Sequence, residues 1–180
     1  MGIWNSLSCG VNSSAMALLF PNIANVMVNT GGNKVSAWKT HHQLQKKRIK
    51  IIVLSSAQQG YSTYYDYIKA NKLMPFYVSC CHKAKYWHLD RFYKQVGPSI
   101  VNIGYCKGEE KRASRQAKKN NKWIKFQFPM LKYSREECKK ILRHHGVQAS
   151  KTGCWFCPKQ PNPPEWAIKN IIRDERVQEW

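Results

Sequence analysis

The sequence has few acidic residues, and none before Asp66. Its 180 residues contain 10 Asp and Glu against 30 Lys and Arg, so the formal net charge is +20. Such an excess favours a polyanionic partner such as nucleic acid, although a merely solvated basic surface is the alternative. Because residues 1–65 contain no Asp or Glu, any chemistry in this stretch must run without a carboxylate of its own.

Long apolar runs are absent too. The longest stretches, residues 15–20 and 49–54, fall far short of the roughly 18 apolar residues that predict a membrane span. The N-terminus has no basic stretch followed by an apolar one, so a signal peptide is not expected. These observations predict a cytoplasmic protein with no membrane partner. In a reducing compartment, cysteines more often serve as metal ligands, catalytic thiols or core residues than as partners in disulfides.

Strand and helix patterns alternate along the chain at the spacing of parallel βαβ units. The sequence therefore predicts an α/β fold: a Rossmann-like parallel sheet flanked by helices, with a cysteine-containing C-terminal segment. We expect one domain over 1–180, with a nucleotide-binding core at 1–105 and the basic segment, last helix and Cys-x-x-Cys part at 106–180. The expected strands span residues 3–7, 25–28, 49–54, 99–104 and 126–130; helices are expected at 15–20, 35–47, within 61–92 and from Ser134 to Gly146.

Two turns rich in small residues follow the first two expected strands. Residues 8–14 read Ser-Cys-Gly-Val-Asn-Ser-Ser and precede a helix, where free backbone N–H groups and the helix dipole favour an anion. An ordinary tight turn has the same appearance. The second turn, containing Thr30 and Gly31, is expected at the same edge of the sheet.

Cys154 and Cys157 have the two-residue spacing that lets two thiolates bind one metal or cluster. The nearest complement is the pair Cys80 and Cys81, with Cys138 as a rival. Four thiolates suit zinc or a 4Fe-4S cluster. A redox dithiol and reduced core cysteines are the alternatives, and Cys138 also lies on the apolar face of its expected helix.

A strongly basic segment spans residues 107–125 and includes Trp123, which could stack on a base. Lysines and arginines that contact phosphates give affinity without sequence specificity. The segment therefore favours contact with nucleic acid, while a solvated charge run is the plainer explanation.

Taken in order, these motifs resemble those of the phosphoadenosine phosphosulfate (PAPS) reductase-like family in the PP-loop superfamily. Residues 8–13 resemble its Ser-Gly-Gly-x-Asp-Ser loop, residues 29–33 its Asp-Thr-Gly-x-Glu turn, and residues 151–158 its Lys-Ser-Gly-Cys-x-x-Cys-Pro segment. Residues 80–92, 104–112 and 128–138 match three further motifs between them. The resemblance covers nearly the whole chain.

The resemblance implies a site that binds ATP or an adenylylated sulfur compound. Its nucleotide-binding residues would be Ser8, Gly10, Val11, Asn12, Ser13, Thr30, Gly31 and Gly104. Catalytic roles would fall to Ser13, Lys85, Glu109 and Arg112. A 4Fe-4S cluster is favoured over zinc, held by Cys80, Cys81, Cys154 and Cys157, or by a set in which Cys138 replaces Cys81. Mg²⁺ could assist through phosphate oxygens, water and Glu109.

The sequence also departs from the family. Asn12, Asn29 and Asn33 stand where the family has carboxylates, and Cys9 replaces a loop glycine. An amide can donate and accept hydrogen bonds but cannot balance the charge of Mg²⁺ or act as a general base. Phosphate binding is therefore better supported than hydrolysis.

Three functional hypotheses follow. The leading one is an ATP pyrophosphatase-type enzyme that adenylates a substrate for sulfur transfer to a nucleic acid, either tRNA or DNA, with a sulfur-donor protein as a further partner. The second is a sulfonucleotide reductase, which the lack of a cysteine after Cys157 disfavours. The third is a basic nucleic-acid-binding module that has lost turnover.

Overall fold

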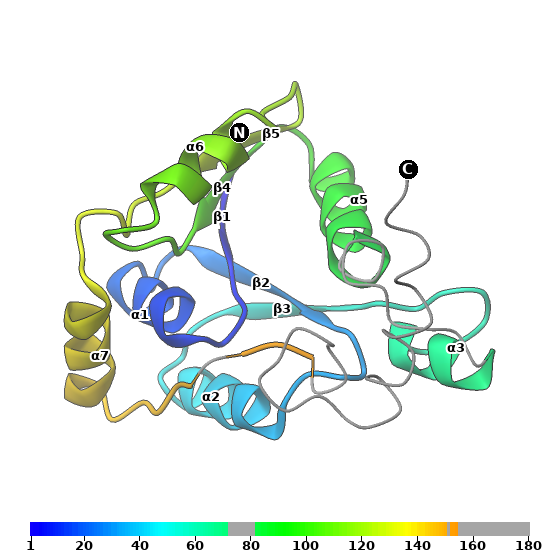
Figure 1. Ribbon diagram of the computed structural model, residues 1–180, viewed down its shortest axis with the longest axis horizontal. Coiled ribbons are helices and arrows are strands. Elements are labelled where there is room, and N and C mark those ends of the chain that lie inside the picture. The colour runs from blue at the N-terminus through cyan, green and yellow to red at the C-terminus, as the bar shows by residue number, and fades with distance from the viewer. Residues whose placement is uncertain (72–81, 151, 155–180) are drawn as a thin grey trace, which may run out of the picture.

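A single sheet of parallel strands organises the molecule. The structure, a computed structural model, describes residues 1–71, 82–150 and 152–154 (Figure 1). Five strands pair in the order β3-β2-β1-β4-β5. Their bounds are β1 Gly2–Ser6, β2 Ala24–Asn29, β3 Ile51–Ser55, β4 Ser99–Ile103 and β5 Ile124–Gln127. The α/β, Rossmann-like fold predicted from the sequence is therefore confirmed.

Helices connect the strands. Within the described residues these are α1 Val11–Leu19, α2 Val35–Lys46, α3 Tyr64–Ala70, α5 Trp87–Val96, α6 Glu110–Ala117 and α7 Arg135–His144, with a short π-helical segment, η1 His82–Tyr86, leading into α5. None of the described helices is long and apolar enough to cross a membrane.

The strand order reverses direction beside β1. The chain steps from β1 to β2 and β3 on one side, then returns to place β4 and β5 on the other. The carboxyl ends of β1 and β4 therefore diverge at a topological switch point, which is where ligands bind in open α/β sheets. β5 follows residue 105, so the two parts of the predicted division contribute to one sheet.

Apolar side chains cover both faces of the sheet. On one face, α1, α2 and α7 enclose the main core, which contains Met16, Leu44 and Leu142. On the other, Tyr93 of α5 packs with Val26 and Val101. Successive strand residues point to opposite faces, and accordingly Met27 belongs to the main core although Val26 does not.

Helix α7 has the termini that its sequence predicts. The Glu137 N–H donates to Ser134 Oγ at 3.2 Å and the Ser134 N–H donates to Glu137 Oε2 at 2.7 Å, which completes a capping box. At the other end Gly146 has a φ of 64°, and the Val147 N–H donates to the Leu142 carbonyl at 2.9 Å. This pairing is a Schellman ending.

Two elements differ most from the bounds expected. Helix α1 begins at Val11 rather than near residue 15, so the small residues of the first turn form the helix N-terminus itself. The last strand runs over 124–127 rather than 126–130, because the chain turns where the Leu131 N–H donates to the Phe128 carbonyl. The sequence also predicts a break at Pro75 within the helical stretch 61–92, and this position lies outside the described residues.

Candidate functional site: a cavity at the switch point

A cavity of about 730 Å³ opens where β1 and β4 diverge. The loop after β1, the first turn of α1, the segment after β4 and residues 150 and 152 line it. Eight residues predicted from the sequence are brought together here: Ser8, Gly10, Val11, Asn12, Ser13, Gly104, Glu109 and Arg112.

The N-terminus of α1 opens into this cavity. Gly10 is its N-cap, no side chain caps it, and its first turn has no acidic residue. The positive end of the helix is thus available to an anion. Ser13 is buried and fixes the loop: its hydroxyl accepts from the Ser8 N–H at 3.3 Å and donates to the Gly10 carbonyl at 3.3 Å.

Gly104 lets the end of β4 approach this helix. A Cβ at Gly104 would lie 3.0 Å from both the nitrogen and the Cα of Ser13, and 3.1 Å from the carbonyl carbon of Asn12. These are backbone atoms of the first turn of α1, so they cannot move aside as a flexible side chain could. The close packing requires glycine.

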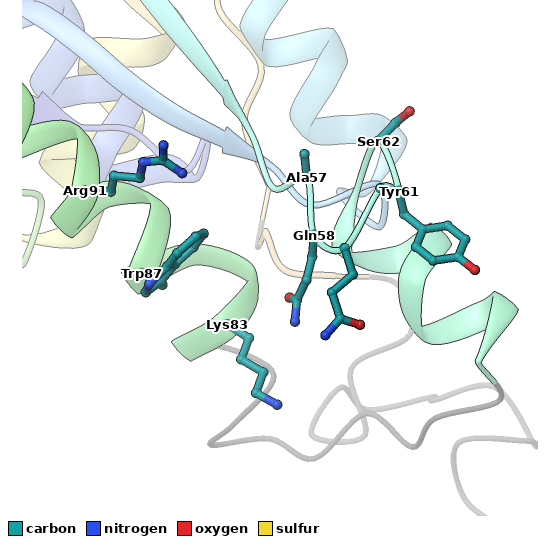
Figure 2. Close-up of a pocket in the computed structure, with 9 residues that line it drawn as sticks. Ala57, Gln58, Tyr61, Ser62, Lys83, Trp87 and Arg91 are labelled. Carbon is teal, nitrogen blue, oxygen red and sulfur yellow. The ribbon is translucent and has the colours of Figure 1, made fainter.

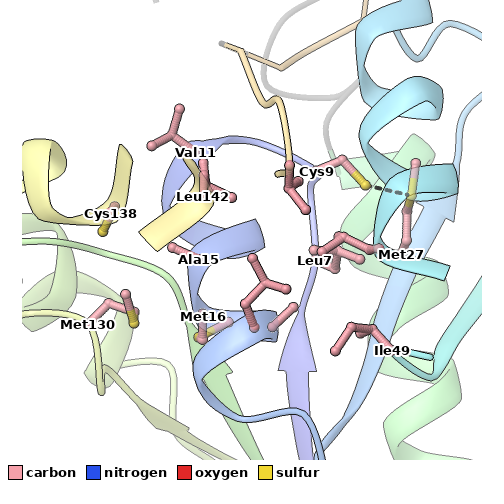
Figure 3. Close-up of a cluster of buried hydrophobic side chains, with 14 of the residues drawn as sticks. Leu7, Cys9, Val11, Ala15, Met16, Met27, Ile49, Met130, Cys138 and Leu142 are labelled. Carbon is pink, nitrogen blue, oxygen red and sulfur yellow. Dashed lines mark hydrogen bonds between the residues drawn. The ribbon is translucent and has the colours of Figure 1, made fainter. Parts of the chain in front are cut away.

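Cys9 occupies the loop position where the family has glycine. Its φ is 58°, a left-handed conformation that costs a residue with a Cβ about 1–2 kcal/mol. The side chain is fully buried, and its thiol donates to Met27 Sδ at 3.5 Å (Figure 3). Burial raises the pKa of Cys9 to about 12, so this thiol stays protonated and acts as a core residue.

Glu109 is the only carboxylate among the described residues that line the cavity. Its Oε2 accepts from Asn12 Nδ2 at 3.2 Å and from the Cys106 N–H at 3.1 Å, and its Oε1 pairs with Arg112. An aspartate at position 12 would put two carboxylates in contact. The asparagine is therefore matched to Glu109, which supplies the negative charge that position 12 lacks.

Among the described residues that line the cavity, cationic side chains are more numerous than carboxylates. Lys107, Arg112 and Arg135 all line the cavity. The Arg112 guanidinium lies 4.7 Å from the centre of the Tyr105 ring, which stacks on Phe128 with centroids 5.8 Å apart. Together with the open helix N-terminus, these charges make the cavity suited to a polyphosphate.

Burial also alters the thiol beside Glu109. It raises the pKa of Cys106, and the neighbouring Glu109 carboxylate raises it further. Cys106 therefore remains a neutral thiol, which accepts from Asn12 Nδ2 at 3.1 Å.

Thr30 and Gly31 do not line this cavity. Thr30 is fully buried, and both its N–H and its hydroxyl donate to Asn33 Oδ1, at 2.8 and 2.7 Å. Asn33 Nδ2 in turn donates to the Val28 carbonyl at 3.1 Å, a bond that a carboxylate could not make. Asn29 Oδ1 accepts from the Gly31 N–H at 2.9 Å. Asn29 and Asn33 thus stabilise the turn after β2.

One of the predicted metal ligands, Cys154, lies against this turn. Cys154 pairs with Asn33 in an antiparallel bridge, and its Sγ lies 3.3 Å from Thr30 Oγ1. Cys154 also packs against the cluster of Tyr64, Ile68 and Ala84.

The other predicted ligands are separated from Cys154 or lie outside the described residues. Cys138 is fully buried in the main core beside α1 (Figure 3), and burial raises its pKa to about 11. Cys80, Cys81 and Cys157 fall outside the residues that the structure describes. Among those it does describe, no three His, Cys, Asp or Glu side chains are grouped to hold a metal.

Two further residues singled out in the sequence lie apart from the switch-point cavity. Lys85 lies in η1 and does not line the switch-point cavity. Trp123 is half-buried against the cluster that contains Val101 and Ile124, with the Lys122 ammonium 5.3 Å from its ring centre, so most of its surface serves packing rather than base stacking.

Sequence reasoning did not assign several residues that line the cavity. Tyr105, Lys107, Arg135 and Thr152 all do so, and the Thr152 hydroxyl donates to Ser8 Oγ at 3.4 Å. Lys107 was visible only as part of a charge run. Thr152 lies in the Lys-Thr-Gly-Cys motif, and its hydroxyl group was the one feature in the sequence that could have indicated a place in the cavity.

No protein-family model and no curated protein matches the chain. Solved structures do. The phosphoadenylyl-sulfate reductase of Candida auris, a phosphate complex, matches with a TM-score of 0.68 and 11% identity over 86% of this chain and 82% of its own. The U34-tRNA thiolase NcsA of Methanococcus maripaludis, with its 4Fe-4S cluster, matches with a TM-score of 0.61 and 15% identity over 99% of this chain and 67% of its own. The chain therefore has a PAPS reductase-like fold.

Proposed function

We propose that the switch-point cavity binds the phosphates of ATP or of an adenylylated sulfur compound. The observation that carries this proposal is the convergence of the uncapped N-terminus of α1 with Lys107, Arg112 and Arg135 around one carboxylate. Each feature favours an anion, and together they favour several linked phosphates. The Candida auris reductase, which shares this fold, was solved as a phosphate complex, and this supports phosphate binding by the fold.

We further propose that the protein is an ATP pyrophosphatase-type enzyme that adenylates its substrate for sulfur transfer to nucleic acid. A substrate oxygen would attack the α-phosphorus of ATP, and the bond to the bridging oxygen would break, which releases pyrophosphate. Arg112 and Lys107 would neutralise the charge that develops on this leaving group. Thr30, Gly31 and Lys85 remain predicted contributors from outside the cavity. The tRNA thiolase among the structural neighbours supports the sulfur-transfer part.

Calorimetry with ATP tests the binding step. Ser13→Ala should weaken binding because the hydroxyl organises the phosphate loop, whereas Ser114→Ala on the exposed surface of α6 should not. Arg112→Gln and Arg115→Gln form a second matched pair on that helix, since only Arg112 lines the cavity. Equal affinities within both pairs, or no ATP binding by the native protein, would refute the site.

Turnover is tested by AMP and pyrophosphate release, measured with and without added nucleic acid. Among the described residues that line the cavity, Mg²⁺ has one carboxylate available, Glu109, and that group already pairs with Arg112. We therefore expect Mg²⁺ to bind with the nucleotide phosphates and not before them. Binding of Mg²⁺ to the nucleotide-free protein, measured by calorimetry, would contradict this expectation.

We propose that Cys80, Cys81, Cys154 and Cys157 hold a 4Fe-4S cluster in preference to zinc. The packing of Cys154 against the cluster that contains Ala84 supports this set, because Ala84 follows Cys81 by three residues. The core position of Cys138 favours the set without it. Iron–sulfur clusters are held by cysteine thiolates, and the protein around the cluster tunes its reduction potential. Iron and sulfide analysis of anaerobically purified protein tests the proposal, and stoichiometric zinc would refute it.

A second candidate is the reductase activity of the other structural neighbour, whose fold matches with the higher TM-score. It predicts sulfite release from PAPS in the presence of thioredoxin. Sulfite formation without AMP release from ATP would favour this reaction over adenylation. Steeply salt-dependent nucleic-acid binding without nucleotide affinity would instead favour the module that lacks turnover.

A further inference from the structure

A second cavity, of about 820 Å³, lies away from the switch point and shares no lining residue with it. It is formed between the loop that follows β3 and the helical segment from η1 into α5 (Figure 2). The side chains that define its chemistry are Gln58, Gln59, Tyr61, Lys83, Trp87 and Arg91.

An exposed indole is the main apolar feature of this cavity. Trp87 is 48% exposed although it is a large apolar side chain on a helix that packs against the sheet. The Arg91 guanidinium lies 5.8 Å from its ring centre, one turn further along α5. Aromatic faces of this kind are the platforms on which unpaired bases stack, and arginine adds a cation–π contribution.

The charged side chains of the described residues that line this cavity are both positive. Lys83 and Arg91 both line the cavity, and no carboxylate of the described residues does so. The neighbouring acid on α5, Asp90, is already paired with Lys94 at 2.7 Å. The cavity therefore offers two cations to phosphates beside an aromatic face.

The opposite wall presents amides from a hydrogen-bonded turn. Gln58 and Tyr61 exchange backbone hydrogen bonds of 3.1 and 2.9 Å. Between them Gln59 and Gly60 have φ values of 47° and 84°, the two positive values of a type I′ turn. In Figure 2 Gln58 lies on the turn, across the cavity from Trp87 and Lys83. Glutamine amides both donate and accept, as base edges require.

We propose that this cavity binds single-stranded nucleic acid, with an unpaired base stacked on Trp87, its edge at the Gln58–Gln59 turn and adjacent phosphates at Lys83 and Arg91. The net charge of +20 favours the same class of partner. The site goes beyond the proposed nucleotide chemistry, because it requires neither ATP binding nor turnover.

Fluorescence anisotropy with labelled single-stranded RNA and DNA of about ten nucleotides tests the proposal. Trp87→Ala should weaken binding by about 5- to 150-fold, the range that loss of one stacked base represents, and Trp87→Phe should restore most of it. Because Trp87 is half-exposed, the alanine variant should fold, and thermal melting verifies this.

Charge variants provide the matched control. Arg91→Gln and Arg143→Gln remove the same charge from the same residue type, and both side chains are exposed, but only Arg91 lines the cavity. Arg91→Gln should reduce the magnitude of the slope of log affinity against log salt by about 0.7, the value for one phosphate contact of a single strand, and Arg143→Gln on α7 should leave it unchanged.

The outcomes separate this site from the nucleotide cavity. Saturating ATP and the Ser13→Ala variant should leave oligonucleotide affinity unchanged, so a failure of either proposal does not imply failure of the other. The inference is overturned if Trp87→Ala binds like the native protein, if Arg91→Gln and Arg143→Gln behave alike, or if only duplexes bind. A higher affinity for RNA than for DNA, or the reverse, would identify which nucleic acid the site prefers.

Discussion

Replacing Gly104 with alanine should separate the end of β4 from the first turn of α1. The new Cβ would lie 3.0 Å from the Ser13 nitrogen and Cα and 3.1 Å from the Asn12 carbonyl carbon. Each contact is shorter than an ordinary van der Waals contact, and none of the three atoms belongs to a movable side chain. Overpacking of this kind costs about 1–3 kcal/mol. For a chain of this length the melting temperature should fall by about 2–12 °C.

The same displacement should weaken nucleotide binding. A shift of the backbone at Asn12 and Ser13 misplaces the N–H groups that face the cavity, and a hydrogen bond to a charged group contributes about 1.5–3 kcal/mol. We therefore expect ATP affinity, measured by calorimetry, to fall by at least about tenfold.

Gly153→Ala is the control for Gly104→Ala. No atom of the described residues lies within 4 Å of a Cβ at Gly153, and its φ is not in the left-handed region. This variant should melt like the native protein. If Gly104→Ala also melts within about 1 °C of the native protein and binds ATP equally well, the close approach is not the constraint described here.

Three further predictions concern the scaffold. Ser134→Ala removes the capping box of α7 and should lower the free energy of unfolding by about 1 kcal/mol in urea titrations; no change would mean that the cap is unimportant. Burial and the nearby His42 lower the pKa of His41, so the unfolded chain binds more protons, and stability should decline as the pH falls below about 6.5. A flat urea midpoint, or the same decline in His41→Gln, would contradict this. Because burial raises the pKa of Cys138 to about 11, iodoacetamide at about pH 8 should leave it unmodified in folded protein but not in urea, as peptide mass spectrometry can check.

Local patterns in the sequence were reliable where the physics is itself local. The Ser134 and Glu137 spacing specifies a capping box within one helical turn, and Gly146 supplies the left-handed residue that ends the helix. The motif resemblance also located eight residues of the switch-point cavity, because the loop after β1 and the segment after β4 each carry a recognisable local signature.

Contacts between distant segments were not predictable in this way. The pairing of Asn12 with Glu109 joins residues 97 positions apart, and it explains an asparagine that in the sequence is only a missing carboxylate. Asn33 is explained in the same manner by its bond to the Val28 carbonyl. Trp123 was expected to be available for stacking, but the sheet packs against it.

The sequence by itself determined the class of fold, the scarcity of acid around the loop after β1 and the local geometry of the helix ends. Each follows from residue type and short-range spacing. Only the tertiary structure decided that Arg135 and Thr152 line one cavity with the loop after β1, that Cys138 belongs to the core, and that Trp87 and Arg91 face the turn after β3. Those arrangements depend on the strand order, which is set by the burial of apolar surface between segments far apart in the chain.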